Sequence, residues 1–288
     1  MYPRSFEYIA ATSLDEALSA LADNPGAKVM TGGMSLIPLM KLRLFSPSLV
    51  VDIGRVPGLD AIDDSGDELA IGALVRHAAT ASSEAVKSGA AALAQAAALT
   101  GDVQVRNRGT TCGAIAHADI AADQTAAVLA LGATMVAKSA SGERTIAAAD
   151  FFVDTLTSAL EPNEILVEVR VPKTGAGSGS AYGKLGRRGG QSDYAVAGAA
   201  AVVTMDGGTV TAASVALTGV GTKPTLAAGV AEALVGTDGS SEAVAGAAGR
   251  ATEGVTVLED LYGSEEYKSH LAQVYAARAV NAAIAAAT

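Results

Sequence analysis

A glycine- and serine-rich segment, Lys173–Ser180, divides this chain into two stretches with different patterns of apolar residues. Clusters of this kind between regularly patterned segments are typical of loops and linkers. After it, the apolar runs Ala195–Met205 and Thr209–Leu217 flank Asp206–Gly208, which predicts a β-hairpin. Helical patterns follow the hairpin over Pro224–Leu234, Ser241–Glu253 and Glu266–Ala286. A sheet followed by helices indicates an α+β fold for the C-terminal part.

The N-terminal part opens with a helix, followed by two strands with a short helix between them. Ser13–Glu16 has the order of a capping box, in which the serine side chain bonds the third helical amide and the glutamate reaches back to the cap residue. An apolar stripe at helical spacing supports this helix. The runs Ala27–Thr31 and Leu49–Ile53 predict strands. Leu36–Leu44 predicts the short helix, because proline is tolerated in a first turn.

The middle of the chain mixes strands and helices. Apolar patterns predict strands over Glu68–Gly72 and Glu164–Val171, a hairpin around Ser141 and Gly142, and helices over Ala90–Leu99 and Gln124–Leu131. Half of the residues are hydrophobic, yet aromatic residues make up only 4% and Trp is absent. The core must therefore be built from Ala, Val, Leu and Ile.

Charge and metal-binding residues exclude several classes of function. Lys and Arg total 20 and Asp and Glu total 30, and an acidic surface argues against nucleic acid as a partner. One cysteine, Cys112, can form no internal disulfide and cannot hold an iron–sulfur cluster by itself. The histidines His77, His117 and His270 lie far apart and show no metal-ligand spacing. Any redox role therefore needs an organic cofactor.

No segment predicts a membrane span or a secretion signal. The most apolar stretch, Tyr194–Met205, lies between Asp193 and Asp206 and is too short to cross a bilayer. Met1–Glu7 contains charged residues and no apolar core of the kind found in signal peptides. We expect a cytoplasmic location.

Two short loops rich in small residues are the candidate binding elements. Gly32–Ser35 follows a predicted strand, so its backbone amides and the helix after it are suited to a diphosphate. Arg108–Ala114 is a second such loop, which would hold the same diphosphate from the other side. Either loop by itself is as easily a tight turn. Neither has the spacing of a nicotinamide-binding Gly-x-Gly-x-x-Gly segment or of a P-loop, and no Gly-x-Ser-x-Gly segment is present.

Other polar residues carry weaker signals. His117 and Asp119 together would suit acid–base chemistry, although a lone histidine beside small residues is more often packed or hydrogen-bonded. Asp123 stands at a predicted helix start, where a negative charge is favourable. A small basic cluster in this acidic chain is most simply a solvated face, and it comprises Lys184, Arg187 and Arg188.

At the two loops the sequence resembles the FAD-binding medium subunits of the xanthine dehydrogenase family, most of all those of molybdenum–copper carbon monoxide dehydrogenases. Gly32–Lys41 matches the family motif Gly-Gly-x-Ser-Leu-x-Pro-x-Met-Lys in full. Arg106–Ala114 matches Arg-Asn-x-Gly-Thr-Ile-Gly-Gly-Asn except at three positions. The resemblance also covers Phe6–Tyr8, Glu164–Leu166 and Tyr182–Ala197, and it runs the whole length of the chain.

This resemblance implies an α+β fold with two domains. Residues 1–175 would form a PCMH-type FAD-binding domain of two α/β subdomains, at about 1–55 and 56–175. Residues 178–288 would form a C-terminal flavoprotein domain with an antiparallel sheet and helices. The cofactor would bridge the two domains.

The resemblance also implies a set of FAD contacts. The stretch 30–36 would hold the diphosphate from one side and the 110–114 loop from the other, while Asp123 would contact the adenosine or ribitol portion. Ile165 and Leu166 would line the adenine or flavin pocket, Lys184 would lie near the flavin ring, and Tyr194 would pack against it. The full set is Met30, Thr31, Gly32, Gly33, Met34, Ser35, Leu36, Thr110, Gly113, Ala114, Ala118, Asp123, Ile165, Leu166, Lys184 and Tyr194.

The function implied by the resemblance is that of an FAD-carrying electron-transfer subunit in a heteromeric molybdenum hydroxylase. A small chain with [2Fe–2S] clusters and a large chain with a molybdopterin cofactor would be its partners, in a dimer of heterotrimers. Electrons would leave to an external acceptor such as a quinone, with the complex at the inner face of the membrane through its partners. Carbon monoxide dehydrogenase is the first expectation for the complex, with aldehyde, nicotine and other N-heterocycle dehydrogenases as alternatives. No catalytic residue or metal is expected in this chain.

Two other functions remain open from the residues. A stand-alone flavin oxidase or reductase would need its own base, for which His117 and Tyr194 are candidates. A cofactor-free assembly subunit is suggested by Cys112 and Ala114, which replace a glycine and an asparagine of the family pattern. A cysteine at a glycine position would crowd a diphosphate or require an unfavourable backbone angle.

Overall fold

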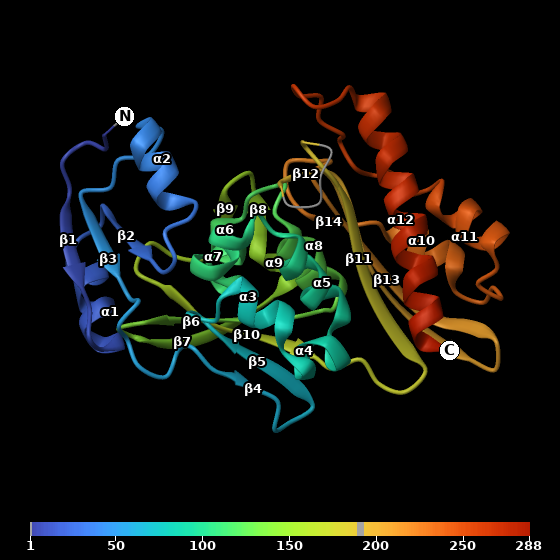
Figure 1. Cartoon of the computed structure of the whole chain (residues 1–288), viewed down its shortest axis with the longest axis horizontal. Coiled ribbons are helices and arrows are strands. Elements are labelled where there is room, and N and C mark those ends of the chain that lie inside the picture. Colours follow the sequence, from blue (N-terminus) through green and yellow to red (C-terminus); the bar gives the residue numbers. More distant parts are fainter. Residues whose placement is uncertain (1, 189–192) are drawn as a thin grey trace.

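The computed structural model describes residues 2–188 and 193–288. The chain forms three successive sheet-containing layers, which Figure 1 shows from the N-terminal strands (blue) to the C-terminal helix (red). Helices and strands are mixed in the manner expected for an α+β fold, which the structure confirms. Among the described residues, no helix is both long enough and apolar enough to cross a bilayer.

The first layer is a three-stranded parallel sheet in the order β1-β3-β2. Its helix α1 is capped at Ser13, whose Oγ accepts from the Glu16 amide at 3.2 Å. The Glu16 carboxylate reaches back to the helix start, as the capping box predicts, but its main backbone donor is the amide of Thr12 at 2.7 Å, one residue before the cap. The elements are β1 (Glu7–Ala10), α1 (Leu14–Asp23), β2 (Ala27–Met30), α2 (Leu36–Leu42) and β3 (Leu49–Asp52).

The second layer is an antiparallel sheet in the order β4-β5-β10-β6-β7, with helices packed on it. The predicted hairpin at Ser141 and Gly142 is confirmed as β6 and β7. The predicted helices over 90–99 and 124–131 are α5 and α8, whereas the shorter helices were not predicted. Its elements are β4 (Ile62–Asp63), β5 (Glu68–Gly72), α3 (His77–Ser82), α4 (Glu84–Gly89), α5 (Ala91–Leu99), α6 (Val103–Arg108), α7 (Thr111–His117), α8 (Asp123–Ala130), β6 (Thr134–Ser139), β7 (Gly142–Ala147), α9 (Ala148–Phe151) and β10 (Ile165–Pro172). A separate two-stranded sheet is formed by β8 (Phe152–Asp154) and β9 (Thr157–Ser158).

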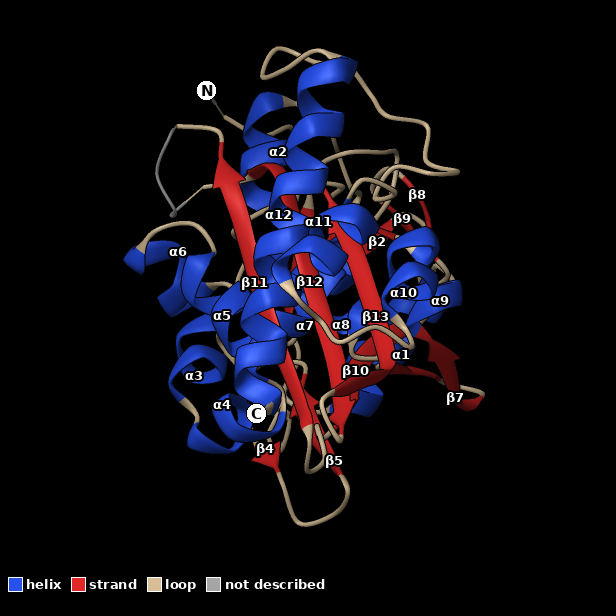
Figure 2. Cartoon of the chain, turned by 90° about the vertical axis from the view of Figure 1, so that its right-hand side faces the viewer, coloured by secondary structure: helices blue, strands red, loops and turns tan. Residues whose placement is uncertain are grey.

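The third layer is an antiparallel sheet in the order β11-β12-β13-β14, covered by α12. Figure 2 shows α12 lying across β11 and β12 in front of the sheet, with α10 and α11 beside it. The turn between β12 and β13 has positive φ at both Gly207 and Gly208, as a two-residue hairpin requires. The elements are β11 (Ser178–Gly186), β12 (Ala195–Asp206), β13 (Thr209–Thr218), β14 (Thr225–Leu226), α10 (Ala228–Leu234), α11 (Ser241–Ala248) and α12 (Glu265–Ala287).

Two predictions in this region are wrong at their boundaries. The glycine- and serine-rich segment is not a free linker along its whole length, because Ser178 already pairs with Thr204 in the sheet. Its first residues are also fixed, since the Lys173 amide bonds Asp67 O and the Thr174 amide bonds Gly89 O. The predicted helix at 224–234 begins later, because Thr225 pairs with Leu217 as part of β14.

Small residues allow α12 to lie close to the third sheet. A Cβ placed on Gly179 would lie 2.1 Å from the Ala283 carbonyl oxygen, so strand and helix backbones are in direct contact there. On the other face of the sheet, the second layer packs through α5 and α8. Two hydrogen bonds cross that interface, from the Ala92 amide to Ser180 Oγ (3.1 Å) and from the Tyr182 amide to Gln95 Oε1 (2.7 Å).

Gly179→Ala is expected to lower the free energy of unfolding by about 1–3 kcal/mol, because the new methyl group overlaps the backbone of α12. The matched control is Gly175→Ala, whose Cβ would meet no atom within 4 Å and which should change stability by less than about 0.5 kcal/mol. Guanidinium unfolding of both variants measures the difference. Equal unfolding midpoints for the two variants would contradict the contact.

Candidate functional site

A cavity of about 960 Å³ opens where the three layers meet. This volume is at the upper end of the range of about 300–1,000 Å³ found for small-molecule sites. Its walls come from the loop before α2, from the start of α7, from the segment between β8 and β10, and from the residues just before β12. A ligand in this cavity would therefore contact all three layers at once.

The two glycine-containing loops touch each other at one end of the cavity. A Cβ on Gly32 would lie 2.0 Å from the Arg108 carbonyl oxygen, so only glycine fits at this crossing. Thr31 Oγ1 and Thr110 Oγ1 are hydrogen-bonded at 2.9 Å. A Cβ on Gly113 would lie within 2.8 Å of both hydroxyls. The structure thus brings together two loops that are 79 residues apart in sequence.

Free backbone amides line the first loop. The amides of residues 33–36 make no hydrogen bond with any other described residue, and Gly33 has a φ of +71° that turns the chain toward α2. Unpaired amides at the start of a helix favour an anion, because each N–H carries a partial positive charge. This run of donors fits a diphosphate without a charged side chain.

The second loop accommodates its unusual cysteine without strain. Cys112 lies in the first turn of α7 and is absent from the described residues with positive φ, so the unfavourable backbone angle expected from the sequence is not found. Its Sγ is directed to the carbonyl of Ile71 in β5, at 3.2 Å. Burial raises the pKa of the Cys112 thiol. The residue is therefore an inert packing side chain.

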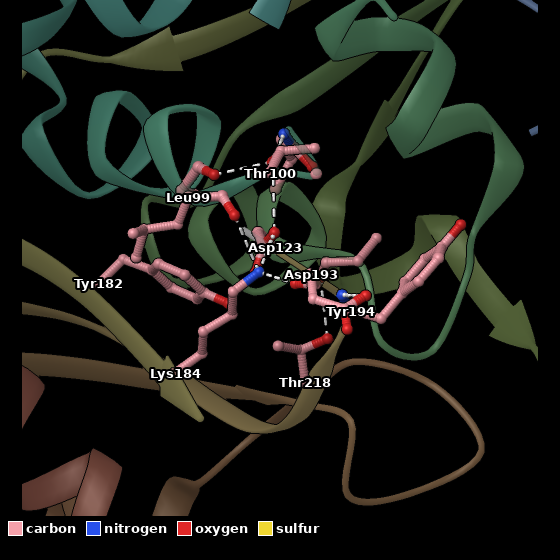
Figure 3. A network of polar contacts seen from close by, with 12 residues as sticks. Leu99, Thr100, Asp123, Tyr182, Lys184, Asp193, Tyr194 and Thr218 are labelled. Atoms are coloured by element: carbon pink, nitrogen blue, oxygen red, sulfur yellow. Dashed lines mark hydrogen bonds and ion pairs between the residues drawn. The ribbon is translucent and has the colours of Figure 1, made fainter. Parts of the chain in front are cut away.

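A buried ion pair at the cavity joins the second and third layers (Figure 3), and its carboxylate, Asp123, lines the cavity. Lys184 Nζ in β11 donates to Asp123 Oδ2 at 2.8 Å, to the Leu99 carbonyl at 3.0 Å, and to the carbonyl of Asp193. The Lys184 and Asp123 side chains are 0% and 4% exposed. The Tyr182 hydroxyl donates to the other Asp123 oxygen at 2.5 Å. Burial raises the pKa of the Asp123 carboxyl, and the surrounding donors act in the opposite direction.

A neutral histidine extends this network. Gln124 Nε2 donates to Thr100 Oγ1 at 2.6 Å and contacts His77 Nδ1 at 3.0 Å. Burial, together with the nearby Arg106 charge, lowers the pKa of His77 to about 4. His77 is therefore uncharged at neutral pH and accepts the amide hydrogen of Gln124. Gln124 Oε1 has no partner among the described residues.

Most of the predicted contacts surround this one cavity. Fourteen of the sixteen line it, and their individual roles stay predictions; the two exceptions are Ala118 and Lys184. Ala118 is buried at the C-terminal cap of α7, with a φ of +52°. Lys184 uses its ammonium group within the chain, as described above. Tyr194 is 40% exposed, and burial and the Asp119 charge raise the pKa of its hydroxyl.

Sequence reasoning missed several polar residues of the site, of which His77, Thr100 and Gln124 line the cavity. Thr100, Gln124 and Tyr182 were not singled out, and His77 was considered only as a possible metal ligand. These residues come from α3, α5, α8 and β11, so no local spacing connects them. The signals near them were the predicted helix start at Asp123 and the basic residue Lys184, which bonds Asp123.

Comparison with known families covers both parts of the chain. The family described as the FAD binding domain in molybdopterin dehydrogenase matches residues 4–174. The family described as the CO dehydrogenase flavoprotein C-terminal domain matches residues 180–283.

Individual relatives match over nearly the full length. The carbon monoxide dehydrogenase medium chain of Hydrogenophaga pseudoflava is 41% identical over 284 residues, 98% of each chain. The 6-hydroxypseudooxynicotine dehydrogenase complex subunit alpha of Paenarthrobacter nicotinovorans is 39% identical over 286 residues, 99% of this chain and 96% of that one.

Solved structures share the fold. Carbon monoxide dehydrogenase from H. pseudoflava, in a form lacking the Mo-pyranopterin moiety, superposes with a TM-score of 0.94 at 42% identity, covering 99% of both chains. Quinoline 2-oxidoreductase from Pseudomonas putida 86 gives 0.92 at 35% identity, covering 100% of this chain and 98% of that one. The cradle of free amides and the glycine crossing fit the FAD named by the first family.

Gly32→Ala is expected to weaken FAD binding by about tenfold or more. The new methyl group would overlap the Arg108 carbonyl, at a cost of about 1–3 kcal/mol, and the two loops would move apart to relieve it. Gly66→Ala, whose Cβ would meet nothing within 4 Å, is the matched control. Titration of the cofactor-free chain with FAD, followed by flavin absorbance, measures both affinities. An unchanged dissociation constant for Gly32→Ala would show that the crossing does not shape the site.

Acid is expected to destabilise the chain through His77. The folded pKa of about 4 lies below the ordinary value of 6.5, so between these values the unfolded state binds more protons. The neutral His77 therefore costs no stability above about pH 6.5. As the pH falls from there toward 4, the free energy of unfolding decreases by up to about 1.4 kcal/mol per pH unit. His77→Gln, which keeps a hydrogen-bonding side chain, should flatten the dependence in denaturant titrations. The exposed His270→Gln should not, and equal slopes for the two variants would refute the assignment.

Proposed function

We propose an electron-transfer role for this chain, which belongs to the family of FAD-binding subunits of molybdopterin dehydrogenases. It is thus a subunit of an oxidoreductase. When bound, FAD supplies the redox chemistry, taking electrons from [2Fe–2S] clusters of a partner chain and passing them to an external acceptor such as a quinone. The observation that carries this proposal is the cavity at whose end the two loops touch.

The chain's own residues bind and orient the cofactor. The free amides of residues 33–36 would hold the diphosphate from one side. Thr110 and Gly113 would hold it from the other, with Thr110 already fixed by its bond to Thr31. Ile165 and Leu166 supply an apolar wall at the cavity, and Tyr194 closes it from the third layer. Holding the cofactor across all three layers would fix its ring relative to the partner chains.

No acid–base residue is required for this role, because electron transfer moves no proton to or from a substrate carbon. His117 and Asp119 line the cavity, so a stand-alone flavin oxidase remains the second candidate function. Burial lowers the pKa of His117, which leaves its imidazole neutral and able to act as a base. Turnover of small donors by the isolated chain would favour this second candidate.

We place the chain in a heteromeric complex with a small iron–sulfur chain and a large molybdenum chain, as a dimer of heterotrimers. The relatives named as medium chains and as a complex subunit support a complex of several chains. Residues 1–175 would form the FAD-binding domain and residues 178–288 the C-terminal domain. The complex would be cytoplasmic, held at the inner face of the membrane through its partners when the acceptor is a membrane quinone.

The substrate of the complex is proposed to be carbon monoxide, with aldehydes and N-heterocycles as alternatives. Identities of 41% to a carbon monoxide enzyme and 39% to a 6-hydroxypseudooxynicotine enzyme are nearly equal. Substrate oxidation would take place in the large partner chain, so this chain can serve several chemistries. Copurification followed by mass spectrometry would identify that partner and decide among them.

Removal of FAD from the purified complex is expected to abolish quinone reduction while leaving substrate able to bleach the [2Fe–2S] absorbance. Adding FAD back should restore quinone reduction, because the flavin is the exit for electrons. Quinone reduction that survives FAD removal would overturn the proposal. A chain that shows no flavin bands even after FAD is added would instead support a cofactor-free assembly subunit.

A further inference from the structure

Three side chains at the edge of the cavity form a stack. The guanidinium carbon of Arg187 lies 5.2 Å from the centre of the Tyr194 ring and 4.6 Å from the centre of the Tyr262 ring. Both distances are within the range of about 6 Å for an attractive cation–π contact. Tyr194 lines the cavity, whereas Arg187 and Tyr262 do not. The stack therefore connects the cavity wall to the loop that precedes α12.

The backbone of Tyr194 is held independently of its ring. Its carbonyl accepts from the Arg187 amide at 3.0 Å, and its amide donates to the Asp193 carboxylate at 2.8 Å. The carbonyl of Asp193 accepts from buried Lys184. Figure 3 shows that the Tyr194 ring points away from this group of contacts. The direction of the ring is thus set by its own contacts, which are the Ser35 side chain at its hydroxyl and Arg187 at its face.

Tyr262 stands on a braced turn. Its amide donates to Asp260 Oδ1 at 2.8 Å, and Lys268 Nζ donates to Asp260 Oδ2 at 2.7 Å. The Asp260 amide bonds the Gly263 carbonyl at 3.1 Å, which closes the turn. The Lys268 side chain is only 2% exposed and is part of α12. The turn is thereby anchored to the longest helix, so it can hold a neighbouring group in place.

Arg187 is located by the two rings. Its Nε is buried and has no hydrogen-bond partner among the described residues. Among the described residues, the Arg187 side chain makes no ion pair within 4 Å. Burial opposes the lowering of the Asp260 pKa, which is due mainly to Lys268 and in a smaller part to the charge of nearby Arg187. A guanidinium close to two aromatic faces gains attraction from both, which holds the two rings near the same group.

We infer that Arg187 and Tyr262 are positioning residues for Tyr194, so that the turn 260–263 sets the pose of the ring that forms the cavity wall. The inference rests on the proposed function in one respect, that the ligand of the cavity is FAD with its flavin beside Tyr194. Neither Arg187 nor Tyr262 lines the cavity that would hold that ligand. Any effect of Tyr262 on the flavin must therefore pass through the stack.

Emission from bound FAD in the full-length chain tests this inference, because a tyrosine ring beside a flavin quenches its fluorescence. Tyr194→Leu should raise the emission at saturating FAD. Tyr262→Ala should raise it by at least about twofold, since the ring of Tyr194 then leaves its position for part of the time. Tyr262→Phe keeps an aromatic face for Arg187 and should restore the wild-type emission.

Two controls separate positioning from a general structural effect. Leu261→Ala removes a side chain of the same turn that is 98% exposed and lies outside the stack, and it should leave emission unchanged. Adding Tyr262→Ala to Tyr194→Leu should give no further rise, because the ring through which Tyr262 acts is already gone.

Three outcomes would overturn the inference. They are wild-type emission for Tyr262→Ala, an equal rise for Leu261→Ala, and a further rise in the double variant. Unchanged emission for Tyr194→Leu would also overturn it, by showing that the flavin is not beside this ring. The FAD titration of the wild-type chain distinguishes this result from failure of the proposed function, in which no FAD would bind at all.

Discussion

The buried pair of Asp123 and Lys184 is the contact on which the geometry of the cavity depends. An ionised side chain without a partner costs several kcal/mol in a protein interior, so the third layer can dock only where the ammonium of Lys184 meets its acceptors. Those acceptors come from the ends of α5 and α8 and from the residue before Tyr194. The same docking position brings Tyr194 to the cavity. The pair therefore fixes the arrangement of the layers, whatever its net contribution to stability.

Small side chains make that arrangement possible at each contact. Gly198 on β12 leaves room for the Tyr182 ring, because a Cβ there would lie 2.8 Å from the Tyr182 hydroxyl oxygen. Gly179 plays the same part under α12, and Gly32 does so where the two loops cross. A chain with few aromatic residues packs through close backbone approach. Close approach also exposes backbone amides to a ligand, so one property of the sequence serves both the core and the binding site.

The fold and the site could be predicted from sequence where the signal is local. The strand, glycine turn and short helix around Gly32 follow from neighbouring residues, and the hairpin turn at Asp206–Gly208 follows from its glycines. Predictions were wrong where pairing with a distant strand decided the outcome, as for Ser178 and Thr225. The hydrogen bond from the Thr12 amide to the Glu16 carboxylate is a smaller example, since it depends on the path of the chain before the helix.

The sequence by itself determined the two loops and their suitability for a diphosphate, because both depend on residue types close together in the chain, while the resemblance of their motifs to a family implied FAD. Only the tertiary structure decided that the loops meet through Thr31 and Thr110 and that Lys184 pairs with Asp123. The same holds for the contact of Arg187 with both Tyr194 and Tyr262. Contacts between residues far apart in the chain leave no periodic signal. They are set by which surfaces can be buried together without leaving a charge or a backbone group unpaired.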